Sequence, residues 1–192
     1  MGQFPQPDRR ARDRALQRDR GLQGPCTGFR VTGIELSGTA VTLARQGDPG
    51  IRYHHGSVLD MPFDDSAYDG IYCFNVLHLF RRDDRAAFLR RCREQLEDGG
   101  VLFFVVFSDR EPSYGTGRLV EENTFESKPG REVHYYSEDD LVSEFQGMEI
   151  LATSLVGDPE EHGEEGRHTH QLRFIYARKS GPEERQKTGT SG

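Results

Sequence analysis

The chain has 192 residues, enough for one globular domain with a single core. Its net charge of −7 argues against a general nucleic-acid binder, because phosphate neutralisation requires clustered Lys and Arg. Three cysteines without paired spacing favour a reducing compartment, and no apolar run approaches the roughly 20 residues that a membrane helix needs. We therefore expect a soluble, cytoplasmic protein that binds neither nucleic acid nor membranes.

The two ends of the chain are predicted to lie outside the folded domain. Residues 1–28 are basic and contain no apolar run, so we expect a poorly ordered or partly helical segment. Residues 180–192 are polar and predict a disordered tail. This leaves 29–179 as the predicted domain.

The first part of this domain alternates short apolar segments with turns. Residues 29–34, 51–54 and 68–74 are predicted strands. Ser37 can cap a short helix after the first of them.

A longer helix is expected to begin near Asp83 and to end at the Asp-Gly-Gly of 98–100. Phe88 and Cys92 then lie on one face of that helix, because they are four residues apart. Residues 101–107 are apolar throughout, which is typical of a strand covered on both faces.

The last elements predict how the sheet ends. Ser137 and Asp140 form a capping-box pattern at the start of another helix. Strands at about 148–155 and 170–177 follow without a helix-length spacer, so they should pair antiparallel. The order predicts an α/β fold: a doubly wound, Rossmann-like, mostly parallel sheet with an antiparallel final strand.

Polar side chains follow three predicted strands at their carboxyl ends, where open α/β sheets bind ligands. Glu35 can accept hydrogen bonds from ribose hydroxyls, or it is a solvated turn carboxylate. Asp60 can accept an adenine amine whose ring packs on Leu36 and Met61, or it serves only its turn. Asn75 offers an amide that can hold an ammonium group.

Four sequence blocks resemble class I S-adenosylmethionine (SAM) dependent methyltransferases. They are Val-Thr-Gly-Ile-Glu-Leu-Ser at 31–37, Gly-Ser-Val-Leu-Asp-Met-Pro-Phe at 56–63, Tyr-Asp-Gly-Ile-Tyr-Cys-Phe-Asn-Val-Leu-His-Leu-Phe at 68–80, and Leu-Glu-Asp-Gly-Gly-Val-Leu-Phe-Phe at 96–104. Each block is weak alone, but four in order are a strong match. The C-terminal part is similar to small-molecule members, including tellurite-resistance-type and archaeal relatives.

The resemblance implies SAM as cofactor and a role for each polar residue. It assigns Glu35 to the ribose, Asp60 and the backbone near Met61 to the adenine, and Asn75 to the methionine amino end or the mouth of the substrate pocket. Leu36 packs beside the adenine in this interpretation. No catalytic residue is assigned, because a sulfonium donor is already activated and positioning can supply most of the rate.

The chain departs from the family before residue 29. The family's first strand and its Gly-x-Gly-x-Gly loop have no counterpart in the Gln-Gly-Pro-Cys-Thr-Gly of 23–28. Without that strand, the strands at 29–34 and 68–74 must pair directly or leave buried backbone groups unpaired, at roughly 1–3 kcal/mol each. We expect a truncated or misread gene start and impaired SAM binding.

The acceptor is predicted to be a small molecule, because no Asn-Pro-Pro-Tyr occurs at 75–78. The polar stretch 108–136 is interpreted as a lid over the pocket, with an ordinary connector as the alternative. Tyr114 and His78 are the candidates for substrate contact, although His78 lies among apolar residues and is better explained as a packing histidine than as a base.

Three histidines near the C-terminus suggest a second kind of chemistry. His168 and His170 are two residues apart, so on a strand both face one side, and with His162 they could hold a transition metal. A polar hairpin that happens to carry histidines is the simpler explanation, and we predict no metal.

Two other functions compete with methyl transfer. One is an inactive methyltransferase-like remnant that serves as a binding module. The other is a nicotinamide-dependent oxidoreductase, because an acid after the second strand of such folds also binds ribose. The sequence does not determine the oligomeric state.

Overall fold

The computed structural model describes residues 29–162 and 166–181, which belong to two compact units divided between Asp64 and Asp65. The predictions made for residues 1–28 and 182–192 fall outside the described residues. The domain limits of 29–179 stay a prediction, and each unit is described separately below.

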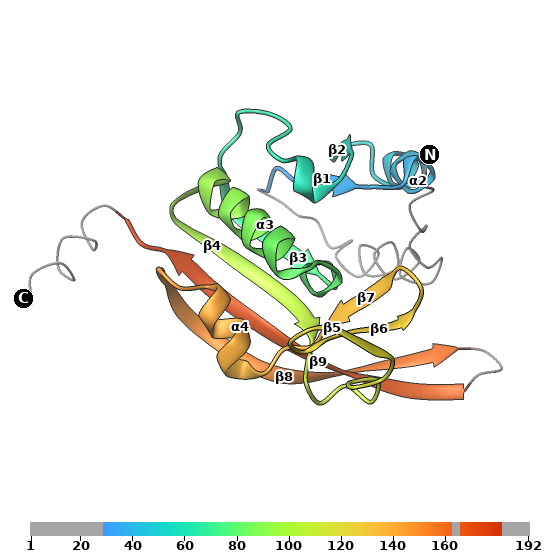
Figure 1. Ribbon diagram of the computed structural model, residues 1–192. Helices are drawn as coiled ribbons and strands as arrows, with labels where there is room; N and C mark the ends of the chain where they lie inside the picture. Colours follow the sequence, from blue (N-terminus) through green and yellow to red (C-terminus); the bar gives the residue numbers. More distant parts are fainter. Residues whose placement is uncertain (1–28, 163–165, 182–192) are drawn as a thin grey trace, which may run out of the picture. The chain divides into compact units, whose positions relative to one another are not determined.

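The described part of the first unit is a β-α-β arrangement (Figure 1). Strand β1 (Thr32–Glu35) pairs in parallel with β2 (Arg52–His55), and helix α2 (Gly38–Gly47) connects them. The Ser37 hydroxyl accepts a hydrogen bond from the Ala40 amide at 3.4 Å, as the predicted cap requires. A one-turn 3-10 helix, η1 (Val58–Asp60), follows β2.

The second unit is built on a four-stranded sheet in the order β3-β4-β9-β8. Strand β3 (Tyr68–Phe74) runs parallel to β4 (Leu96–Phe107). Strand β9 (Gly166–Lys179) lies antiparallel between β4 and β8 (Met148–His162). The last two strands pair antiparallel as predicted, but the sheet is not mostly parallel as predicted, because β9 pairs antiparallel with both of its neighbours.

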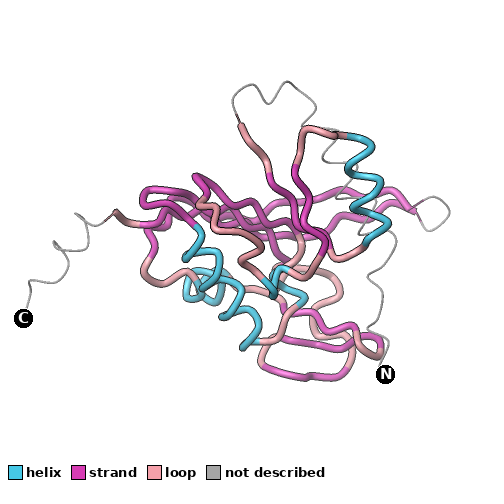
Figure 2. Tube along the Cα trace, turned by 90° about the horizontal axis from the view of Figure 1, so that it is seen from above, coloured by secondary structure: helices cyan, strands magenta, loops and turns pink. Residues whose placement is uncertain are grey.

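One face of this sheet carries the core of the second unit. Helices α3 (Arg82–Gln95) and α4 (Glu138–Glu144) lie on the same side of the sheet (Figure 2). Phe104 of β4 contacts Phe88 of α3 at 5.9 Å between ring centroids and Phe145 beyond α4 at 5.4 Å. Phe104 and Phe145 are fully buried, so these rings join both helices to the sheet.

The opposite face of the same sheet is aromatic. Phe103 stacks on Tyr72 of β3 and on Phe174 of β9, with ring centroids 5.8 and 5.5 Å apart. Tyr72 is 61% exposed. This face therefore differs from the helix-covered face in carrying a large exposed ring.

The polar stretch 108–136 contains structure that the sequence analysis did not predict. It forms a three-stranded antiparallel sheet from β5 (Arg118–Glu121), β6 (Thr124–Lys128) and β7 (Arg131–His134). Phe125 is the one hydrophobic residue of β6, so the periodic signal for this strand was weak. The segment rejoins the main sheet where Ser108 and Tyr136 form an isolated parallel bridge.

Other boundaries also differ from those predicted. Strand β4 begins at Leu96, five residues before the predicted start, because Leu96 pairs with Tyr68 and an irregularity in the register then leads to the pairing of Val101 with Gly70. The β8–β9 hairpin extends to His162 and Gly166, well beyond the predicted ends. The described strands form three sheets: one of β1 and β2, one of β3, β4, β9 and β8, and one of β5, β6 and β7.

Candidate functional site

In the first unit, Glu35 ends β1 and Asp60 lies in the short helix η1 that follows β2. Strands β1 and β2 run in parallel with Glu35 opposite His55, so both end at the same edge. The Gly56 amide continues this pairing by donating to the Glu35 carbonyl at 3.0 Å. Asp60 follows four residues later, at the end of η1, and is exposed.

The Glu35 carboxylate is held by the backbone that follows it. Its Oε1 accepts a hydrogen bond from the Ser37 amide at 2.6 Å, and the side chain is half-buried. That contact fixes one carboxylate oxygen and leaves the other to accept bonds from a ligand. A charged acceptor fixed in this way is suited to neutral hydroxyl donors such as those of a ribose.

The two apolar residues predicted beside the adenine have different environments. Leu36 is 58% exposed, whereas Met61 is 6% exposed. Leu36 also offers its carbonyl to the His55 ring nitrogen Nε2 at 3.1 Å. An exposed leucine next to a fixed carboxylate provides the apolar surface on which a flat ring can pack.

Asn75 lies in the second unit at the carboxyl end of β3. Its φ of 56° is in the left-handed region, which asparagine tolerates better than most residues. The backbone amide of Asn75 donates a hydrogen bond to the Val105 carbonyl at 2.9 Å, which continues the β3–β4 pairing. The side-chain oxygen Oδ1 is buried and has no hydrogen-bond partner among the described residues. A buried acceptor without a donor is costly, so this atom is suited to receive one from a ligand.

His78 is a buried packing residue rather than an exposed base. It is 2% exposed, and its ring stacks on Phe107 with centroids 4.4 Å apart. Its Nδ1 accepts a hydrogen bond from the Phe107 amide at 3.3 Å. Burial, together with electrostatic interactions with His134, His170 and Arg131, lowers the pKa of His78 to about 3, which keeps the ring neutral at pH 7.

Tyr114 lies in the turn region between β4 and β5. Its hydroxyl donates to Asn123 Oδ1 at 3.0 Å, and its ring makes edge contacts with Phe125 and Tyr135. It is 41% exposed. These neighbours, on or beside the small sheet, hold the Tyr114 ring in place. The contact of Tyr114 with a substrate stays a prediction.

A cavity of about 470 Å³ opens between α3, α4 and the small sheet. A network that the sequence analysis missed lines part of it. Glu144 accepts from Arg85 Nε at 2.7 Å and from the Tyr136 hydroxyl at 2.9 Å. Burial acts against the charged form of Arg85, but Tyr136 and Glu144 raise its pKa above the ordinary value. His134 bonds to Asp140 at 2.8 Å in the same cavity.

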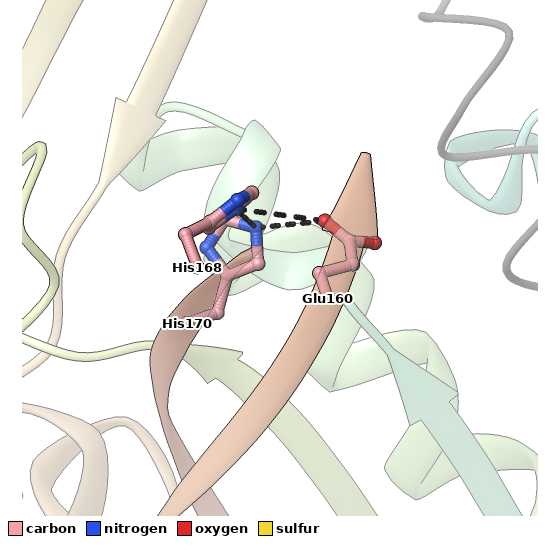
Figure 3. Close-up of side chains that lie close together, drawn as sticks. All are labelled: Glu160, His168 and His170. Carbon is pink, nitrogen blue, oxygen red and sulfur yellow. Dashed lines mark hydrogen bonds and ion pairs between the residues drawn. The ribbon is translucent and has the colours of Figure 1, made fainter. Parts of the chain in front are cut away.

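The β8–β9 hairpin brings two of the three predicted histidines together. His168 and His170 lie side by side with Glu160 (Figure 3). The side chain of His162 lies outside the described residues. Glu160 and Glu111 were absent from the sequence prediction. Glu111 precedes His170 by 59 residues, so no local spacing connects the two.

Comparisons with known proteins agree with the arrangement of these elements. Residues 20–104 match the family model described as "Methyltransferase domain". A probable S-adenosylmethionine-dependent methyltransferase from Mycolicibacterium smegmatis is 29% identical over 100 residues, which are 52% of this chain. The chain spans 37% of the length of that relative.

Solved structures show the same fold at lower identity. A SAM-dependent methyltransferase from Methanosarcina mazei is 19% identical, with a TM-score of 0.65 over 80% of this chain and 84% of its own. The 1,6-didemethyltoxoflavin-N1-methyltransferase of Burkholderia thailandensis, solved with S-adenosylhomocysteine, is 21% identical, with a TM-score of 0.60 over 90% and 68%. Among the described residues, no helix is long and apolar enough to span a membrane.

Proposed function

We propose that this chain is a class I SAM-dependent methyltransferase, as the match of residues 20–104 to the methyltransferase-domain model supports, and that it transfers a methyl group from SAM to a small-molecule acceptor. The observation that carries the proposal is that Glu35 ends β1 opposite the last residue of β2, and that Asp60 lies in the 3-10 helix that follows β2. Open α/β sheets bind nucleotides at the carboxyl ends of their strands.

We assign each end of the adenosine to one of these carboxylates. Glu35 has an oxygen fixed by the Ser37 amide and is proposed to accept from the ribose hydroxyls. Asp60 is exposed and is proposed to accept from the adenine amine, with the backbone at Met61 beside it. The exposed side chain of Leu36 is proposed to pack against the adenine ring.

Asn75 is proposed for the methionine amino end of SAM. Its buried Oδ1 lacks a donor, and an ammonium group is a strong one. SAM, when bound, would supply a methyl group attached to a positively charged sulfur. The methyl group would pass to the acceptor, and the sulfur would leave as part of a neutral thioether. The chain itself then needs to orient the acceptor and exclude water, and a base is required only for an acceptor that carries a proton.

The sequence before β1 bears on the affinity for SAM. Residues 24–28 contain two glycines but not Gly-x-Gly-x-Gly, and Pro25 has no amide hydrogen to donate. We therefore propose that SAM binding is weaker than in a domain with that loop. The structured segment 109–136, with Tyr114 held by Asn123, is proposed to cover the acceptor side.

Titration calorimetry with SAM and S-adenosylhomocysteine tests this proposal. Glu35→Gln keeps an acceptor for the Ser37 amide but removes the charge, so affinity should fall about 10- to 100-fold. Asp60→Asn should have a similar effect, because the amide loses the charge and half of the acceptor capacity. Glu97→Gln, at an exposed position in the second unit, is the matched control and should leave affinity unchanged.

The same titration separates the competing functions. Saturable binding of SAM that depends on Glu35 and Asp60, without methyl transfer to any small acceptor, would favour a binding module. Competition by NAD but not by S-adenosylhomocysteine would favour an oxidoreductase. SAM binding that is equal in the wild type and both variants would contradict the assignment of the carboxylates.

A further inference from the structure

The β8–β9 hairpin carries a cluster of metal-binding side chains that methyl transfer does not use. We propose that Glu160, His168 and His170 bind a divalent transition metal, preferentially zinc, and that Glu111 positions the His170 ring. The proposal does not depend on SAM binding.

Strand pairing places the three ligands on one face. Glu160 lies directly opposite His168 in the antiparallel register, and His170 is two residues beyond His168. Residues two apart on a strand face the same side. Figure 3 shows the two imidazole rings and the Glu160 carboxylate turned toward one another.

The distances between the ligand atoms match a tetrahedral site. His170 Nε2 is 3.2 Å from Glu160 Oε2, and His168 Nε2 is 3.6 Å from the same oxygen. The two Nε2 atoms are 2.9 Å apart. Zinc bonds of about 2.0–2.1 Å in a tetrahedron place ligand atoms about 3.3 Å apart, so the largest adjustment is about 0.4 Å.

Glu111 completes the arrangement that metal-binding histidines usually have. Its Oε1 lies 2.7 Å from His170 Nδ1, and its Oε2 accepts from the Gln171 amide at 2.7 Å. A carboxylate can only accept here, so the hydrogen of a neutral His170 ring lies on Nδ1 and the lone pair of Nε2 faces Glu160 and His168. Phe107 stacks on the His170 ring at 5.1 Å and further fixes its plane.

Burial and charge favour a cation at this position. The side chains of Glu111, His170 and Glu160 are 4%, 13% and 14% exposed. The carboxylates of Glu111 and Glu160 flank the His170 ring, and carboxylate oxygens attract a divalent cation. Two histidines and one carboxylate are also a known zinc ligand set that keeps a fourth position for water or another ligand.

The second cluster of this kind in the described residues is a poorer candidate. His134, Asp140 and Glu144 also lie close together. However, both oxygens of Glu144 already accept hydrogen bonds, one from Arg85 and one from Tyr136. An ion there would have to displace the buried side chain of Arg85 from Glu144.

Zinc titration of the full chain tests the proposal. The protein is first treated with a chelator and dialysed, and zinc chloride is then added in a calorimeter near neutral pH. We expect one zinc per chain. His168→Ala is the decisive variant because that side chain is 44% exposed, so its loss should not prevent folding, and it should weaken binding at least about 100-fold.

Further variants distinguish ligands from the positioning residue. His170→Ala and Glu160→Gln should also weaken zinc binding strongly. Glu111→Gln should still bind one zinc but about 10- to 100-fold more weakly, because it acts through His170. Glu149→Gln, in an exposed ion pair with Arg178 at the other end of the hairpin, is the control and should bind zinc as the wild type does.

Two outcomes would overturn the site. One is a wild-type chain that takes up no zinc, which would show that His170 is held between Glu111 and Glu160 by protons alone. The other is binding that survives His168→Ala and His170→Ala but is lost in His134→Ala, which would place the metal in the other cluster.

Discussion

The two units of the chain differ in how much of their apolar surface is buried. In residues 29–64, the buried hydrophobic side chains are Ala40, Val41 and Met61, whereas those of the second unit include Phe104, Phe145 and many others. The first unit nevertheless carries both carboxylates proposed for the adenosine. The difference indicates that the residues proposed to bind the cofactor lie on elements that bury few hydrophobic side chains. Most of the folding free energy is therefore expected to come from the second unit.

The largest effect that tests this comparison is expected in the core of the second unit. Phe104→Ala should lower the free energy of unfolding by about 3–5 kcal/mol, because it removes a fully buried ring that contacts both α3 and α4. Val41→Ala in α2 should cost only about 1–2 kcal/mol, since it deletes two buried methyl groups.

Urea unfolding followed by circular dichroism measures both changes. Equal losses of stability in the two variants would show that the units do not differ in the way described. A larger loss in Val41→Ala would reverse the comparison.

A smaller effect is expected from His78, which is buried in the second unit. Its pKa is about 3 in the folded protein, against 6.5 for an ordinary histidine. The unfolded chain therefore binds a proton below pH 6.5 that the folded chain resists, so stability falls as the pH drops from 6.5 toward 3. The loss from this residue should be about 1.4 kcal/mol between about pH 7.5 and pH 5.5.

Unfolding of the wild type and of His78→Gln at both pH values isolates this contribution. The variant should be less stable at the higher pH but should lose less stability on acidification. An identical pH dependence in the two proteins would mean that another group is responsible.

Local sequence signals predicted the elements of both units well. Ser37 and Ser137 cap α2 and α4, with their hydroxyls accepting from Ala40 and Asp140. Such signals act over three or four residues, so a single sequence contains them in full. The parallel strands that end at Glu35 and His55 were also predicted, from short apolar segments separated by turns.

Contacts between distant segments were not predictable in the same way. Arg85 meets Glu144, and Glu111 meets His170, across 59 residues in each case. Nothing in the local pattern of either residue specifies its partner, because the partner is set by how α4 and the hairpin pack on the sheet. The small sheet at 118–134 was missed for a related reason: its short polar strands bury few residues and give a weak periodic signal.

Hydrogen–deuterium exchange of the full chain with and without S-adenosylhomocysteine tests the central claim most directly. The account predicts that the ligand slows exchange at the amides around Glu35–Ser37 and at 57–61, and that Asp60→Asn weakens this protection. Protection confined to the cavity beside α3 and α4, with no change at those two segments, would contradict it.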